Sequence, residues 1–160
     1  MPENQICTGI TLELTVQDLV WRGRGLARLD SGQVVLIDPG VFPGERIRVQ
    51  VTKVKPDYLE AKWSEIVVPH PRRRPHPCPL ADRCGGCRFG WLPNRQQLEL
   101  KTAVIQNELH RALSRTVGSD LPPVQAVPSP KKWRYRWRGQ MHVSQGQPCM
   151  MSLQGGDPLP

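Results

Sequence analysis

A proline-rich segment near the middle of this 160-residue sequence prevents a helix or a strand from continuing from one side of it to the other. Residues 69–79 read PHPRRRPHPCP, with five prolines among eleven residues. Proline has no backbone N–H to donate, so this segment can sustain neither a helix nor a β-ladder. The sequence therefore predicts three parts: a first domain over residues 1–68, a linker with a cysteine loop over residues 69–93, and a helix with an incomplete domain over residues 94–160.

Residues 1–68 show the alternation of apolar and polar side chains that is typical of half-buried strands. Residues 10–16 (ITLELTV) place four aliphatic side chains on one face, and residues 46–54 (RIRVQVTKV) repeat the same period. Two further strands are expected around a turn at residues 30–32, and a fifth over residues 58–66. Five short strands in about 65 residues indicate a small OB-like antiparallel barrel.

Residues 94–160 show a helical pattern first and a strand-like pattern later. Asn94 is expected to cap a helix, with Gln97 completing a capping box, and apolar residues recur at helical spacing to about Leu113. Residues 131–143 (KKWRYRWRGQMHV) are predicted to form a strand with aromatic side chains on one face and basic ones on the other. The expected fold class is therefore mainly β with α: a barrel, a cysteine loop, one helix and the start of a central α+β domain.

Three cysteines lie within ten positions of the segment HPCPLADRCGGC, residues 76–87. Closely spaced cysteines in a reducing compartment are more often metal ligands than disulfides. The two glycines before the last cysteine can adopt positive φ, so that both flanking sulfurs face one centre. This spacing favours an iron–sulfur cluster. The alternatives are zinc, completed by His76 or His70, and three unliganded thiols. The candidate ligands are Cys78, Cys84 and Cys87.

Charge is distributed unevenly between the two sides of the linker. Residues 1–68 hold 8 Lys/Arg and 9 Asp/Glu, whereas residues 69–160 hold 14 and 5. The first part is thus near neutral and the second strongly basic. A basic domain without a lipid-seeking apolar stretch points to RNA or DNA as the partner rather than a membrane. A merely solvated basic surface is the alternative.

The candidate RNA-binding side chains fall in two groups. On the predicted barrel, arginines flank glycines that permit close backbone approach, as a nucleic-acid surface of OB type requires. In residues 131–138, basic side chains would hold phosphates and an aromatic ring would stack on a base. Solvated arginines and an aromatic core face are the structural alternatives. The residues are Arg22, Arg24, Arg28, Lys131, Lys132, Arg134, Tyr135, Arg136 and Arg138.

Motifs along most of the chain resemble those of the RNA uracil-5-methyltransferase family. The Cys-x5-Cys-Gly-Gly-Cys loop is similar to the four-iron, four-sulfur motif that follows an N-terminal TRAM domain in that family. GRGLAR (23–28) and PGVFPGE (39–45) resemble the glycine-rich motifs of TRAM domains. QLELK (97–101) and WRYRWRGQ (133–140) resemble the helix and strand that follow the loop in the family.

The resemblance implies a four-iron, four-sulfur cluster whose fourth cysteine stands in a Cys-Pro context. Cys149 precedes Met150 and matches that context poorly. The fourth ligand is therefore expected beyond Pro160, with Cys149 as the alternative. The resemblance also implies S-adenosylmethionine, bound by a C-terminal Rossmann-like domain. No strand with a glycine-rich turn of that kind occurs in these residues, so no catalytic residue is assigned and the chain alone is expected to be inactive.

The sequence is thus interpreted as the RNA-binding, iron–sulfur N-terminal portion of a methyltransferase acting on ribosomal or transfer RNA. It shows no signal peptide and no run long enough to span a bilayer, which predicts a cytoplasmic protein. The protein is also expected to be a monomer. Two alternatives stay open. One is a stand-alone TRAM-type RNA-binding or metal-responsive module, and the other is a zinc-stapled structural protein without RNA affinity.

Overall fold

The computed structural model describes residues 6–118, 121–135, 137–152 and 157–159. The chain divides into two compact units, and the boundary between them in the sequence lies between Pro71 and Arg72. Each unit is described by itself below.

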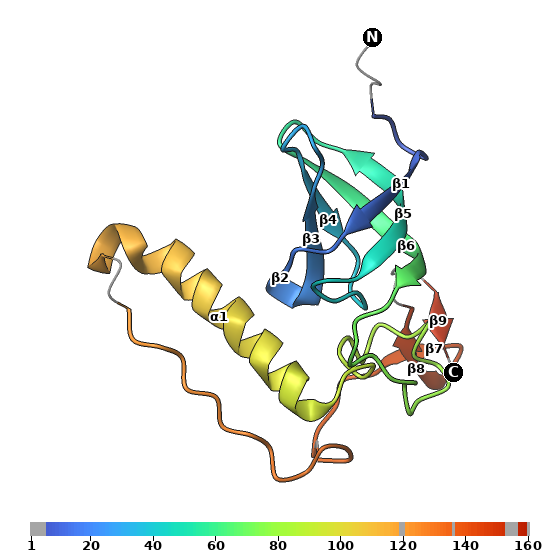
Figure 1. The fold of residues 1–160 in the computed structure, drawn as a ribbon. Coiled ribbons are helices and arrows are strands. Elements are labelled where there is room, and N and C mark those ends of the chain that lie inside the picture. The colour runs from blue at the N-terminus through green and yellow to red at the C-terminus, as the bar shows by residue number, and fades with distance from the viewer. Residues whose placement is uncertain (1–5, 119–120, 136, 153–156, 160) are drawn as a thin grey trace. The chain divides into compact units, whose positions relative to one another are not determined.

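The first unit is a curled six-stranded sheet, shown in blue to green in Figure 1. The strand order is β1-β5-β6-β4-β3-β2, and all neighbours are antiparallel except β4 and β6, which run parallel. The strands are β1 (Thr11–Thr15), β2 (Asp18–Val20), β3 (Arg24–Arg28), β4 (Val34–Ile37), β5 (Arg46–Val54) and β6 (Tyr58–Val68). The predicted mainly β, OB-like fold class is confirmed.

The core of this unit lies on the concave face of the curled sheet. The alternating aliphatic residues that the sequence pattern indicated are those that are buried, for example Ile47, Val49 and Val51 along β5. They pack with residues of β1, β3, β4 and β6 in one cluster. At about 25 cal/mol per Å² of apolar surface removed from water, this shared face is the main stabilising contribution to the sheet.

Two features of the barrel differ from the prediction. The structure has an additional short strand, β2, which pairs with β3 and makes six strands rather than five. Three residues are too few to show a period, so the sequence carried no signal for this strand. In addition, β6 continues to Val68, two residues past the predicted end.

Gly25, the second glycine of GRGLAR, is required by close packing. A Cβ built on this residue would lie 2.6 Å from Cγ2 of Val41, far inside van der Waals contact. Val41 belongs to the PGVFPGE loop and is fully buried. The two glycine-rich motifs therefore meet in the core, one supplying space and the other the side chain that fills it.

The second unit contains one long helix, α1 (Asn94–Val117), and a small three-stranded sheet. The sheet consists of β7 (His142–Ser144), β8 (Gln147–Met151) and β9 (Pro158–Leu159) in that order. Trp91 and Leu92, just before the helix, are buried, as are Ala81 of the cysteine loop and Cys149 of β8. The described residues between α1 and β7 form no helix or strand (orange in Figure 1).

The expected capping box at the start of α1 is wrong. The residue at the N-cap position is Pro93, and no side chain caps the helix there. A capping box needs the N-cap backbone N–H as a donor, which proline lacks. The Gln97 side chain instead donates to the Leu92 carbonyl oxygen at 2.9 Å. The helix extends past the predicted end at Leu113 and stops at Gly118, whose φ is 80°.

The strand predicted over residues 131–143 is also wrong. In the described part of this segment, only His142 and Val143 lie in a strand, β7. Arg134 has a φ of 54°, which breaks an extended run. An alternating pattern favours a strand only where a neighbouring strand completes the ladder, and none pairs with residues 131–135 or 137–141 here.

Within the described residues, no helix combines the length and apolar character that crossing a membrane requires.

Candidate nucleic-acid interface and cysteine loop

The cysteine loop is held by backbone contacts with the small sheet of the second unit. Cys84 forms an antiparallel bridge with Ser152, and the Gly85 N–H donates to the Met151 carbonyl oxygen at 3.0 Å. The Gly86 N–H points at the Cys84 sulfur, at 3.4 Å. Residues at the C-terminal end of β8 thus position the middle of the loop, a long-range contact that the spacing of the cysteines did not indicate.

None of the three loop cysteines forms a disulfide. Cys78 and Cys87 are exposed and Cys84 is half-buried. Among the described residues, no three Cys, His, Asp or Glu side chains gather closely enough to hold a metal ion. The donor chemistry fits a soft metal or an iron–sulfur cluster, because thiolates are its preferred ligands. In this structure the three sulfurs do not converge on one point.

His76, one of the two candidate zinc ligands, accepts a hydrogen bond and packs against an aromatic ring. Its Nδ1 accepts a hydrogen bond from the Cys78 N–H at 3.0 Å, which places the proton of a neutral ring on Nε2. Nε2 is buried without a hydrogen-bond partner among the described residues. The ring lies 4.8 Å from the Trp91 ring, measured between centroids. In this structure the His76 ring packs within the second unit and holds the Cys78 N–H.

Cys149 lies in β8 and is 4% exposed. Its neighbour Met150 faces the loop, since the Met150 methyl group lies 2.9 Å from the Cβ position of Gly86. Successive side chains of a strand point to opposite faces, so Cys149 points away from the face that contacts the loop. The structure does not bring Cys149 together with Cys78, Cys84 and Cys87.

The three candidate arginines of the barrel differ in availability. The Arg24 guanidinium donates to the Leu36 carbonyl oxygen at 3.3 Å and lies 3.9 Å from a Glu60 oxygen, with its Nε buried. This arginine is tied to the sheet. Arg28 is exposed, and its guanidinium donates a long hydrogen bond of 3.4 Å to the Gly32 carbonyl oxygen. Arg28 is thus better placed than Arg24 to meet a phosphate.

Trp21 is a surface residue that the sequence analysis missed. It begins the short 3₁₀ segment η1 (Trp21–Gly23) between β2 and β3, and it is 64% exposed. The next residue, Arg22, is exposed and has a φ of 66°, a left-handed conformation that is uncommon outside glycine. A large exposed aromatic next to arginines suits base stacking. The signal in the sequence was the run WRGR, in which Trp21 directly precedes the arginines that flank Gly23.

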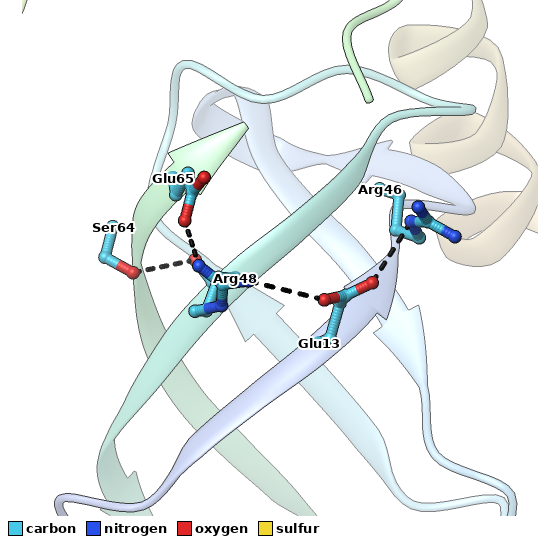
Figure 2. A network of polar contacts seen from close by, with 5 residues as sticks. All are labelled: Glu13, Arg46, Arg48, Ser64 and Glu65. Atoms are coloured by element: carbon cyan, nitrogen blue, oxygen red, sulfur yellow. Dashed lines mark hydrogen bonds and ion pairs between the residues drawn. The ribbon is translucent and has the colours of Figure 1, made fainter. Parts of the chain in front are cut away.

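Another face of the barrel carries arginines that are neutralised. Figure 2 shows Glu13 of β1 between Arg46 and Arg48 of β5, at 3.1 and 3.6 Å. Arg48 also pairs with Glu65 of β6. With two arginines and two glutamates this network has no net charge, and each member is substantially exposed. It offers no excess positive charge to a polyanion.

The basic segment of the second unit is open to solvent. Lys131, Lys132, Arg134 and Arg138 are exposed, and Arg136 lies outside the described residues. The aromatic residues of this segment do not form a core face. Trp133, Tyr135 and Trp137 are 41%, 57% and 95% exposed, although Trp133 contacts the edge of the His76 ring at a centroid distance of 5.8 Å.

Comparison with known families and proteins identifies relatives of both units. Residues 5–63 match the TRAM domain family. The chain is 37% identical over 131 residues to the 23S rRNA (uracil(1939)-C(5))-methyltransferase RlmD of Dichelobacter nodosus, which covers 81% of this chain and 29% of that protein. Uncharacterised RNA methyltransferases of Bdellovibrio bacteriovorus and Parasynechococcus marenigrum are 33% and 37% identical, each over 87% of this chain.

The matched region is a minor part of each relative. The chain spans 29–34% of the length of these three proteins. A solution structure of a conserved Methanococcus maripaludis protein is 34% identical over 41% of this chain and 90% of that one, with a TM-score of 0.36.

Proposed function

We propose that this chain, whose residues 5–63 belong to the TRAM domain family and most of which resembles RNA uracil-5-methyltransferases, is an RNA-binding portion of such an enzyme acting on ribosomal or transfer RNA. The observation that carries this proposal is the contrast between two surfaces of the TRAM domain. Trp21 and Arg28 are exposed, whereas the arginines of the network in Figure 2 are neutralised by glutamates.

The strongly basic character of residues 69–160 supports the same partner. Lysines and arginines that neutralise phosphates release counterions, which makes RNA affinity fall as salt rises. The exposed Lys131, Lys132, Arg134 and Arg138 can contribute in this way. Ribosomal and transfer RNA both present single-stranded loops with unstacked bases, which an exposed aromatic such as Trp21 can stack on.

The test is a titration of fluorescently labelled RNA with the full chain at several salt concentrations. Trp21→Ala and Arg28→Gln are expected to weaken binding several-fold each. Arg46→Gln removes the same charge from the neutral network and serves as the matched control, with an expected change below about twofold. Equal effects of Arg28→Gln and Arg46→Gln would contradict the assignment of the surface. Salt-independent binding, or none, would contradict RNA as the partner.

We further propose that methyl transfer from S-adenosylmethionine to uracil C5 is carried out by the longer enzyme, outside these 160 residues. The relatives are about three times longer than the matched region. The expected result is that the purified chain incorporates no labelled methyl group into uracil-containing RNA, while it still binds that RNA. Incorporation of the methyl group by the chain alone would overturn the proposal that methyl transfer is carried out outside these 160 residues.

We also propose that Cys78, Cys84 and Cys87 hold a four-iron, four-sulfur cluster, with a fourth ligand outside the residues that gather in this loop. Three cysteines within ten residues, none of them in a disulfide, support it, and so does the Gly86 N–H directed at the Cys84 sulfur. When bound, the cluster would supply a structural cross-link rather than a reactive centre. The loop backbone already contacts Met151 and Ser152, so the cross-link would fix the loop to the small sheet.

Anaerobic reconstitution with iron and sulfide, followed by metal and sulfide analysis, tests the cluster. Cys84→Ser is expected to abolish iron incorporation. Cys7→Ser removes an exposed free thiol outside the loop and should leave it unchanged. A colourless protein that carries zinc in place of iron would overturn the cluster and support the zinc alternative.

A further inference from the structure

The second unit contains a groove that none of the assignments above explains. It lies between the first two turns of α1 and residues 128–135, and has a volume of about 550 Å³. Volumes of roughly 300–1,000 Å³ are typical of small-ligand sites. Both walls belong to the second unit, so the groove does not depend on how the two units are placed. Its size suits one nucleotide, not a duplex.

The groove is cationic. Its described lining includes Arg95, Lys101, Lys131 and Lys132 and no carboxylate. Arg95 is paired with Glu99, one turn along the helix. Within the described part of the chain, no carboxylate forms an ion pair with any of the three lysines. Lys101 lies over the Phe89 ring instead, with Nζ 5.1 Å from the centroid, a contact that orients the ammonium group without neutralising it.

Local contacts set the two walls of the groove. Gln97 and Lys101, four residues apart, both line it from α1, because residues at this spacing share one face of a helix. The Gln97 amide is fixed by its bond to the Leu92 carbonyl oxygen. On the other wall, the Ser129 hydroxyl donates to the Lys131 carbonyl oxygen at 2.7 Å. This bond closes the turn that presents the lysine pair.

The groove also has an aromatic wall. Tyr135 lines it and remains 57% exposed, which leaves the ring accessible to a flat ligand. Phosphate-binding lysines together with an accessible aromatic ring are the combination that binds single-stranded nucleic acid, where the ring stacks on a base. An acidic protein segment would use the lysines but would gain little from the ring.

We propose that this groove binds one nucleotide of single-stranded RNA, with its phosphate held by Lys101, Lys131 and Lys132 and its base stacked on Tyr135. The inference rests on the proposed RNA-binding function and adds a defined nucleotide subsite to it. It assigns a role to α1 that the sequence analysis did not, since Arg95 and Lys101 were not among its candidates. Asn94, at the first helical position, lines the groove with an amide that can hydrogen-bond a base edge.

The test uses the full chain and a labelled, unstructured oligouridine RNA. Lys101→Gln is expected to weaken binding about tenfold at low salt and to reduce the slope of log affinity against log salt by about 0.7, the value for one phosphate contact on a single strand. Arg111→Gln is the matched control. It removes one positive charge from the same helix at a residue that pairs with Glu108 and does not line the groove.

Tyr135 tests the base contact separately. Tyr135→Ala should weaken binding about tenfold, whereas Tyr135→Phe keeps the ring and should bind like the unaltered chain. RNA carrying 4-thiouridine should crosslink to residues of the groove, as located by mass spectrometry, and the crosslink should be lost in Lys101→Gln. Circular dichroism establishes that each variant keeps the helix.

The outcomes separate this inference from the proposed function. If Trp21→Ala and Arg28→Gln weaken binding while Lys101→Gln and Tyr135→Ala behave like Arg111→Gln, the groove is not a subsite and the proposed function stands. If Tyr135→Ala and Tyr135→Phe bind equally well, base stacking is overturned. If the unaltered chain does not bind RNA at all, both proposals fail.

Discussion

The buried carboxylate of Glu45 joins the PGVFPGE loop to the chain that leaves the barrel, because it accepts a hydrogen bond from the His70 backbone N–H at 3.0 Å. The other carboxylate oxygen accepts from the Phe42 N–H at 2.9 Å. Glu45 is fully buried, its bond to the Phe42 N–H is buried, and its bond to the His70 N–H is partly buried. The conformation of the loop and the exit of β6 are thereby set by one side chain.

Replacing Glu45 should destabilise the first unit strongly. Glu45→Ala removes the acceptor of the buried Phe42 N–H and of the partly buried His70 N–H, and a buried N–H left unsatisfied costs about 1–3 kcal/mol. We expect the free energy of unfolding, measured by urea denaturation, to fall by about 2–5 kcal/mol. Glu65→Ala, in the exposed network of Figure 2, is the control and should cost less than about 1 kcal/mol. Similar losses in the two variants would contradict the role given to Glu45.

Gly25 should tolerate no larger residue unless its neighbour shrinks. An added Cβ would meet Cγ2 of Val41 at 2.6 Å, and overpacking of this kind costs about 1–3 kcal/mol. Gly25→Ala is therefore expected to lower the thermal midpoint. Combining it with Val41→Ala should lose less stability than the sum of the two single changes. Strict additivity in this double-mutant cycle would show that the two positions do not compete for space.

The cysteine loop should depend on Gly90. A Cβ at this position would lie 1.8 Å from Nε2 of His76, so Gly90→Ala must displace the imidazole and break its bond to the Cys78 N–H. We expect loss of the near-ultraviolet circular dichroism of Trp91, which packs on the same ring. Adding His76→Ala removes the clash and should restore part of the signal. An unchanged spectrum for Gly90→Ala alone would refute this packing.

Thiol reactivity should separate Cys149 from the other cysteines. In the reduced, metal-free chain, brief alkylation is expected to modify the exposed Cys7, Cys78 and Cys87, while Cys149, at 4% exposure, reacts only after unfolding in urea. Peptide mass spectrometry measures each site. Alkylation of Cys149 as fast as that of Cys7 would mean that β8 does not cover it.

Removing a glutamate from the neutral network should affect RNA binding in the direction opposite to removing a barrel arginine. Glu13→Gln leaves Arg46 without its partner and Arg48 with only Glu65. We expect RNA affinity to rise modestly at low salt and the gain to vanish at high salt, where surface charges are screened. Stability should change by less than about 1 kcal/mol. A drop in affinity would indicate that the network itself contacts RNA.

Much of the first unit was predictable from the sequence. The period of two along residues 10–16 and 46–54 follows directly from which face of a strand is buried, and the strands formed where it indicated. The long helix was predicted for the same reason, from its period of about 3.6 residues. The TRAM-like motifs were informative because glycines and buried residues there meet steric requirements, as Gly25 and Val41 show.

Other features depend on residues that are distant in the sequence, and the tertiary structure alone decided them. The sequence predicts Arg24 as a phosphate ligand, but the fold places the Leu36 carbonyl oxygen and the Glu60 carboxylate beside its guanidinium. The alternating segment at residues 131–143 formed no long strand, because a ladder needs a partner that a local pattern cannot supply. The groove likewise joins α1 to residues 128–135. Periodicity reports which face of a segment is apolar, whereas the pairing of charges and the walls of a site depend on what the fold brings alongside.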